Sequence, residues 1–225
     1  MANLALFDLD MTLLNMDSDH SWGQFIVEQG LIDAKFYANA NDKFYQDYIA
    51  GTLDAVEYNE FVAGFLKTQS MSKLHAHRQA YLDSWIKPNM RPLGIQQIHK
   101  HRQAGDTVVI ISATNDFVVV PIAGLFGIDE KHTLATKLEV IDDAYTGRVA
   151  DRPNFKEGKL YHLNRLISQY ADEGVRFDRL IAYSDSKNDI PLLSFADEAV
   201  CVNPDAILTK YAQEQGWRIE DWAMA

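Results

Sequence analysis

The chain has 225 residues, 47% of them hydrophobic and 24% charged, which is enough to bury a full core and excludes the disordered and fibrous classes. Its formal net charge is −11 without any long run of Lys and Arg, so a broad nucleic-acid-binding face is excluded. A phosphate site confined to a cleft stays open, because one lysine and a metal ion can reverse the local field.

The N-terminal residues and the cysteine content favour a cytoplasmic protein. The apolar run between Asn3 and Asp8 has only four residues, at positions 4–7, which is too few for a signal peptide or a membrane-spanning helix. Cys201 is the single cysteine, so no intrachain disulfide forms and a reducing compartment is the simpler expectation. We therefore expect no membrane partner, and either a monomer or a homodimer.

The first predicted elements are one strand and a long helical stretch. Residues 4–7 are an apolar run that ends abruptly in polar residues, which predicts a buried strand. From about residue 18 to residue 85, aromatic and aliphatic side chains recur every three or four positions, which predicts helices. Breaks between these helices are expected near Gly30, Gly51 and Gly64.

Strands and helices alternate in the rest of the chain. The predicted elements are a helix over 93–104 closed by Gly105, a strand over 107–111 ending at Ser112, a helix over 117–126, a hairpin over 138–149, a helix over 156–170, and strands over 179–183 and 199–202. His99 and His101 are expected on the outer surface of the first of these helices. The alternation predicts an α/β fold with a parallel sheet, into which the long helical stretch is inserted.

Small or acidic polar residues follow three of the predicted strands. They are Asp8 with Asp10, Ser112, and Asp185 with Asp189. Ligands bind beyond the carboxyl ends of the strands in open parallel sheets, so four carboxylates and a hydroxyl share one crevice if these strands are neighbours. Such like charges need a cation, and oxygen-only ligands suit Mg²⁺. The scattered histidines form no zinc-binding pattern.

The order of these pieces resembles the motifs of the haloacid dehalogenase superfamily of phosphatases. The resemblance rests on Asp-Leu-Asp-Met-Thr at 8–12, Ser112 after an apolar strand, Lys159 in Glu-Gly-Lys, and Asp-Ser-Lys-Asn-Asp at 185–189. One Asp-x-Asp-x-Thr alone is a weak match, whereas all four pieces in order cover nearly the whole chain. The insertion and the hairpin resemble the phosphoserine-phosphatase-like branch, subfamily IB, which carries a helical C1-type cap.

The resemblance implies the following division of the chain. A Rossmann-like core, with helices on both faces of its parallel sheet, comprises residues 1–16 and 87–225. A helical cap comprises residues 17–86 and gates the cleft.

The resemblance also implies roles for the motif residues. Asp8 is the nucleophile that forms an aspartyl-phosphate, and Asp10 is the general acid and then the general base. Thr12 is expected to hold the loop. Mg²⁺ is expected on Asp8, the backbone carbonyl of Asp10, Asp185 and, directly or through water, Asp189.

Phosphate binding is expected from the second and third motifs. The Ser112 hydroxyl and neighbouring backbone amides, including that of Ala113, would bind the phosphoryl oxygens. Lys159 would offset their charge and keep Asp8 ionised. Lys156 is a competing candidate, because residues three apart share a helix face.

The segment at the start of the predicted cap allows two interpretations. Phosphoserine phosphatases carry a glutamate near the position of Asp17 that meets the substrate ammonium, so Asp17 or Asp19 would bind an amine. Alternatively, Ser18 or Asp19 is a helix N-cap.

The resulting functional hypothesis is a Mg²⁺-dependent phosphomonoesterase acting on a small phosphorylated metabolite such as phosphoserine or histidinol phosphate. A phosphotransferase to an alcohol acceptor and a non-catalytic binding module on the same scaffold are the alternatives. Dehalogenation, a third alternative, has no use for Asp10 as a leaving-group acid, so the acidic cluster argues against it.

Overall fold

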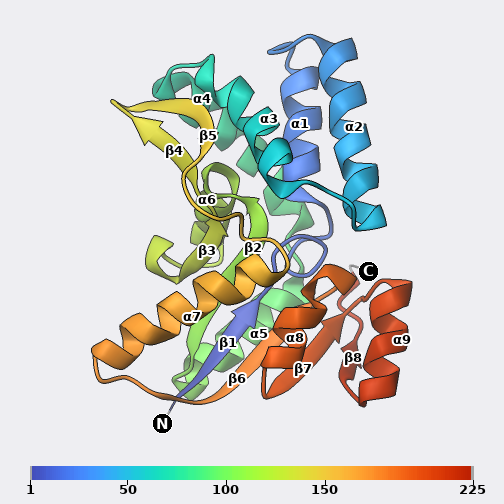
Figure 1. Cartoon of the computed structure of the whole chain (residues 1–225), viewed down its shortest axis with the longest axis vertical. Helices are drawn as coiled ribbons and strands as arrows, with labels where there is room; N and C mark the ends of the chain where they lie inside the picture. The colour runs from blue at the N-terminus through green and yellow to red at the C-terminus, as the bar shows by residue number, and fades with distance from the viewer. Residues whose placement is uncertain (1, 224–225) are drawn as a thin grey trace.

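A computed structural model describes residues 2–223, apart from the side chain of Phe36, and its centre is a parallel sheet (Figure 1). Six strands pair in the order β3-β2-β1-β6-β7-β8. Their bounds are β1 Ala2–Phe7, β2 Thr107–Asn115, β3 Thr133–Thr136, β6 Phe177–Ser184, β7 Glu198–Val202 and β8 Arg218–Glu220. In the central strand, Ala5 lies opposite Val108 of β2 on one side and Ile181 of β6 on the other. The predicted strands are therefore neighbours.

Helices cover both faces of this sheet. Alternate residues of β1 face opposite sides, so Leu4 and Leu6 belong to one hydrophobic cluster, whereas Ala5 and Phe7 belong to another. Helices α7, α8 and α9 pack in the first cluster, and α5 and α6 pack in the second. Their bounds are α5 Pro92–Ala104, α6 Asp116–Leu125, α7 Glu157–Asp172, α8 Ile190–Phe195 and α9 Ala206–Gln215. The predicted α/β class is confirmed.

Four helices between β1 and α5 stand beyond the carboxyl ends of the strands, together with a small hairpin (Figure 1). They are α1 Ser18–Glu28, α2 Ala34–Ala50, α3 Ala55–Lys67 and α4 Met71–Tyr81, and the hairpin is β4 Leu138–Ile141 with β5 Ala144–Val149. A π-helical turn over Leu82–Ile86 and a 3₁₀ turn over Lys87–Asn89 lead back to the sheet. The inserted helical cap is confirmed, while its division from the core at residues 17 and 86 stays a prediction.

Three of the four glycines that were predicted to end helices do so. Gly30, Gly51 and Gly105 have φ values of 66°, 80° and 82°, and each lies at or just beyond the end of a helix. Gly64 does not break its helix, because α3 runs through it to Lys67. A single glycine weakens a helix without ending it when neighbouring side chains such as Val62 are buried.

Four further expectations need correction or completion. Strand β2 continues past Ser112 to Asn115, because it pairs with β3 there. Strands β3 and β8 were not predicted, since both are short edge strands.

His101 is buried instead of exposed. Its Nδ1 lies 2.8 Å from Asp106 Oδ2 and its Nε2 lies 2.8 Å from the Tyr183 hydroxyl, so polar partners inside the fold satisfy both ring nitrogens.

No helix in the described part of the chain is long and apolar enough to cross a membrane. The oligomeric state and the cytoplasmic location stay predictions.

Gly158, the second residue of α7, allows a close backbone approach. A Cβ atom at this position would lie 2.0 Å from the carbonyl oxygen of Pro153, which is backbone and cannot move aside easily. We expect Gly158→Ala to lower the free energy of unfolding by about 1–3 kcal/mol, because the added methyl overpacks the start of the helix. Urea denaturation measures this change.

Gly64→Ala is the matched control. Gly64 is exposed within α3 and a Cβ there has nothing within 4 Å, so the substitution should raise the free energy of unfolding by about 0.5–1 kcal/mol. Equal stability of the two variants would contradict the steric argument.

Candidate active site

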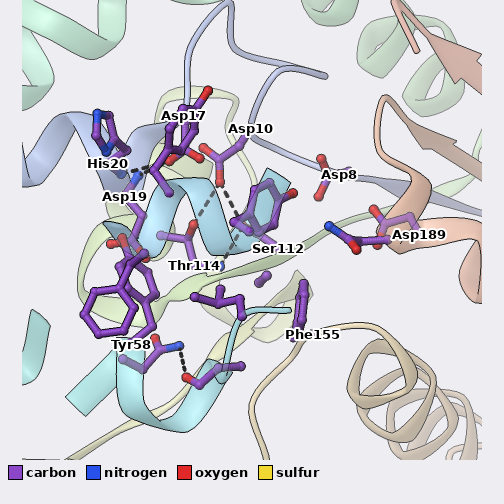
Figure 2. A pocket seen from close by; sticks show the side chains of 18 of the residues that line it. Asp8, Asp10, Asp17, Asp19, His20, Tyr58, Ser112, Thr114, Phe155 and Asp189 are labelled. Atoms are coloured by element: carbon purple, nitrogen blue, oxygen red, sulfur yellow. Dashed lines mark hydrogen bonds between the residues drawn. The ribbon is translucent and has the colours of Figure 1, made fainter. Parts of the chain in front are cut away.

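The carboxyl end of β1 places Asp8 between the two neighbouring strands. The Asp8 amide donates to the Tyr183 carbonyl of β6 at 2.9 Å, which extends the sheet pairing by one residue into the loop. Ser112 of β2 lies on one side of Asp8, and Asp185, just after β6, lies on the other. The structure thus brings the predicted strand-end residues to one edge of the sheet, and Figure 2 shows Asp8, Ser112 and Asp189 among them.

A buried lysine joins two of the predicted carboxylates. The Lys159 ammonium, 3% exposed, donates to Asp8 Oδ1 at 2.8 Å and to Asp189 Oδ2 at 2.6 Å. Ser184 also donates to Asp189 Oδ2, at 2.7 Å. Lys156 points elsewhere and donates to the carbonyl of Gly51 at 2.8 Å. Of the two candidate lysines, Lys159 is therefore the one beside Asp8.

Asp10 is held by donors from both the cap and the sheet. Its Oδ1 accepts from the Ser18 amide at 2.7 Å, at the start of α1. Its Oδ2 accepts from the Thr114 hydroxyl at 2.8 Å and from the Ser112 hydroxyl at 3.3 Å (Figure 2). Thr114 is a contact that the sequence did not suggest, because β2 was expected to end two residues earlier.

The Thr12 hydroxyl lies 3.2 Å from both Asp8 Oδ2 and Asp185 Oδ1. The loop that places it includes Met11 at a φ of 57°, in the left-handed region that few non-glycine residues adopt. Thr12 therefore connects the Asp8 and Asp185 carboxylates, in keeping with its expected role in holding the loop.

Burial and mutual repulsion raise the pKa values of the clustered carboxyls. Burial raises the pKa of Asp8 to about 7; Lys159 opposes the rise, whereas Asp189 and Asp10 add to it. Burial also raises the pKa of Asp185 well above its ordinary value, and the charges of Asp8 and Asp189 add to the effect. One ammonium therefore does not balance the negative charge of this cluster.

The pKa values of Lys159 and Asp10 both rise, but for different reasons. Burial acts to lower the pKa of Lys159, but the Asp189 and Asp8 carboxylates outweigh it and the pKa rises, so the ammonium stays charged. The pKa of Asp8 rises as well, because burial, together with the charges of Asp189 and Asp10, outweighs the effect of Lys159. Burial and the charge of Asp17 raise the pKa of Asp10 to about 6, which suits a proton donor near neutral pH.

The donor set at this edge fits a hard divalent cation. In residues 2–223, no three His, Cys, Asp or Glu side chains converge as a complete metal cage. The Asp8 and Asp185 carboxylates lie close to one shared hydroxyl and carry uncompensated charge, as carboxylate ligands of Mg²⁺ would. Asp189 is bonded to Lys159, an arrangement compatible with the water-mediated option rather than direct ligation.

Asp17, and not Ser18 or Asp19, is the N-cap of α1. Its Oδ1 accepts from the amides of Asp19 at 3.0 Å and His20 at 2.8 Å. Asp19 is buried inside the first turn, where it accepts from Asn115 Nδ2 at 3.1 Å and from the Tyr58 hydroxyl. Burial raises the pKa of both carboxyls. Asp17 thus combines the capping role with a place in the cavity described next.

One cavity connects the strand ends to the cap. The core contributes Asp8, Asp10, Ser112, Ala113, Thr114, Phe155, Lys159, Asn188 and Asp189, and the cap contributes Asp17, Asp19, His20, Phe44, Tyr45, Tyr48, Leu53, Ala55, Tyr58 and Asn59. Figure 2 shows Asp17, Asp19 and His20 together on one side and Asp8 with Asp189 on the other. The cap tyrosines and Asn59 were missed, because their spacing predicts helices without indicating which face meets the core.

A family model of haloacid dehalogenase-like hydrolases matches residues 5–194. The chain belongs to this family. The matched range includes every predicted site residue of the haloacid dehalogenase-like core, from Asp8 to Asp189, so the resemblance inferred from the motifs is confirmed. The chain is accordingly a phosphatase of the haloacid dehalogenase type, as its relatives also indicate.

The relatives match nearly the whole chain. A histidinol-phosphatase of Neisseria meningitidis serogroup C is 40% identical over 220 residues, covering 97% of this chain and 98% of its own. A protein of unknown function from Bordetella pertussis has a similar structure, with a TM-score of 0.91, 35% identity, and coverage of 99% and 100%. A substrate-bound phosphoserine phosphatase, at a TM-score of 0.67 and 21% identity, covers 93% of this chain and 90% of its own and supports the fold alone.

Lys159 and Lys156 provide a matched pair of substitutions. Lys159→Met removes the cation between Asp8 and Asp189, so we expect kcat/KM to fall by about 10²-fold or more. Lys156→Met removes a hydrogen bond to Gly51 and a cation–π contact with Phe155, neither of which involves Asp8 or Asp189, and should cost less than about tenfold. Steady-state phosphate release measures both, and equal losses would contradict the assignment of Lys159.

The raised pKa of Asp8 makes the stability of the metal-free protein depend on pH. Its folded-state pKa of about 7 lies above the ordinary 3.8, so its contribution to stability is complete below about pH 4 and is lost as pH rises through about 7. We expect Tm in EDTA to fall between about pH 4 and pH 7, and to fall less in Asp8→Asn. Glu28→Gln, at the exposed end of α1, should keep the wild-type slope.

Proposed function

We propose that the chain is a Mg²⁺-dependent phosphomonoesterase that hydrolyses histidinol phosphate, or a closely similar phosphate ester with a cationic nitrogen and no carboxylate. The observation that carries the proposal is the charge of the cavity. Asp17 and Asp19 line its cap side, and neither takes part in an ion pair within the described residues. A cationic group on the substrate would supply the missing countercharge.

The same lining disfavours phosphoserine. Lys159 is the only Lys or Arg among the described residues that line the cavity, and it is already bonded to Asp8 and Asp189. Burial lowers the pKa of His20, the one lining histidine, so it supplies little positive charge at neutral pH. The carboxylate of phosphoserine would therefore lack a cationic partner, whereas histidinol phosphate has an amine and an imidazole instead. The name of the Neisseria relative supports this choice.

The first half of the proposed reaction transfers the phosphoryl group to the enzyme. An oxygen of Asp8 attacks phosphorus while the bond to the ester oxygen breaks. Asp10 donates its proton to the leaving alkoxide, a task suited to its raised pKa. Ser112 and the Ala113 amide hold phosphoryl oxygens, and Lys159 offsets the charge on Asp8.

The second half releases the phosphoryl group to water. The Asp10 carboxylate takes a proton from a water molecule, whose oxygen attacks phosphorus, and the bond to Asp8 breaks to give inorganic phosphate. Mg²⁺, held by Asp8, the Asp10 carbonyl and Asp185, would neutralise charge on the phosphoryl oxygens when bound. The hydrogen bonds from Ser18 and Thr114 keep Asp10 in one orientation for both proton transfers.

Phosphate release from three esters with Mg²⁺ tests this proposal. We expect kcat/KM for histidinol phosphate to exceed that for phosphoserine by about tenfold or more, because only phosphoserine places an unpaired carboxylate in the acidic cavity. Glycerol phosphate, which has neither nitrogen nor carboxylate, should fall between them. EDTA and Asp8→Asn should each abolish release.

Two outcomes would contradict it. Faster release from phosphoserine would remove the charge argument, and release that survives EDTA would exclude the metal. The phosphotransferase alternative is separated by adding glycerol as an acceptor to the histidinol phosphate reaction: hydrolysis yields equimolar histidinol and inorganic phosphate, whereas transfer yields glycerol phosphate.

A further inference from the structure

Asn59 lines the cavity and carries a buried hydrogen-bond acceptor without a partner among the described residues. It belongs to α3, is 2% exposed and lines the cavity on the cap side. Its Nδ2 donates to the Ala55 carbonyl at 2.8 Å, one turn earlier in the same helix. Its Oδ1 is buried and has no hydrogen-bond partner among the described residues.

The orientation of this amide is fixed by its helix. If the two ends of the Asn59 amide exchanged places, Oδ1 would face the Ala55 carbonyl oxygen and two acceptors would repel each other. The bond to Ala55 therefore keeps Nδ2 on the helix and leaves Oδ1 as the free atom. Buried polar atoms without partners are rare in folded proteins, which makes this acceptor a candidate for a ligand contact.

The surroundings of Asn59 select the kind of donor. Its neighbour Tyr58 donates a hydrogen bond from its hydroxyl to the Asp19 carboxylate, and Asn115 donates to the same carboxylate. The cap side of the cavity thus combines the Asn59 acceptor with two acidic side chains, Asp17 and Asp19. A protonated nitrogen matches both the acceptor and the charge, whereas a carboxylate or ether oxygen matches neither.

We propose that Asn59 Oδ1 accepts a hydrogen bond from an N–H group of the substrate, which makes Asn59 a specificity-determining residue. The proposal rests on the proposed phosphatase function, because the phosphoryl group must lie at Asp8 for its organic portion to reach the cap. Asn59 lies on α3 of the cap, and no hydrogen bond among the described residues joins it to Asp8 or Asp10, so it would act on binding of the ester and not on bond breaking.

The test compares a nitrogen-bearing ester with one that lacks N–H groups. Asn59→Leu and Asn59→Ala both remove the acceptor, so kcat/KM for histidinol phosphate should fall about ten- to a hundredfold, mainly through a higher KM. Release from phenyl phosphate should change less than about threefold. Asn59→Ala, which adds no bulk, carries the test if Asn59→Leu does not fold.

Tyr37→Phe is the matched control. The Tyr37 hydroxyl is also buried without a partner in the cap, but Tyr37 does not line the cavity. Its loss should leave the ratio of kcat/KM for the two esters unchanged.

The outcomes separate this inference from the proposed function. If wild-type protein hydrolyses histidinol phosphate and the Asn59 variants keep the wild-type ratio, the assignment of Asn59 is wrong and the function stands. An equal fall of kcat/KM for both esters would likewise contradict the assignment, because it would show that Asn59 affects only the structure of the cap. If wild-type protein hydrolyses phenyl phosphate but no ester with an N–H group, both proposals are overturned.

Discussion

The ammonium of Lys159 between Asp8 and Asp189 is the interaction on which the site depends. Three different parts of the chain meet there: the end of β1, the start of α7 and the loop after β6. Such a pair is costly to bury unless its hydrogen bonds are satisfied, and Ser184 supplies a further donor to Asp189. The sheet order, with β1 next to β6, is what allows one ammonium to contact both carboxylates.

Lys159 is one cation among several carboxylates, so part of the negative charge of the cavity has no countercharge. This excess negative charge has a consequence at each end of the cavity. At the strand ends it raises the pKa of Asp8 and Asp185 and favours a divalent cation between them. At the cap end, Asp17 and Asp19 have only neutral donors, which favours a cation on the substrate. The cavity therefore favours positive charge at both ends, and the proposed Mg²⁺ would offset the charge of a dianionic phosphate there.

The sequence was informative where chemistry follows directly from position along a strand. Asp8, Ser112 and Asp185 were predictable because each ends an apolar run, and parallel strands deliver their carboxyl ends to one edge. Asp17 was misjudged as to its capping role, since several neighbouring residues can cap a helix and only backbone geometry selects one. The role of Asn59 could not be predicted from the sequence. A polar residue within a helical pattern is expected to be exposed to solvent until the packing of the cap is known.

The loops that carry Lys159 and Asp185 also hold the cap, so the proposed catalytic groups and the position of the cap are physically linked. Lys156, three residues before Lys159, donates to the carbonyl of Gly51, and Lys187, two residues after Asp185, donates to the carbonyl of Ile49. Both carbonyls lie at the C-terminal end of α2, where the helix dipole favours a cation. Movement of α2 away from the core must break both bonds. The position of the cap is thereby tied to the same loops that set the spacing of the lysine and carboxylates.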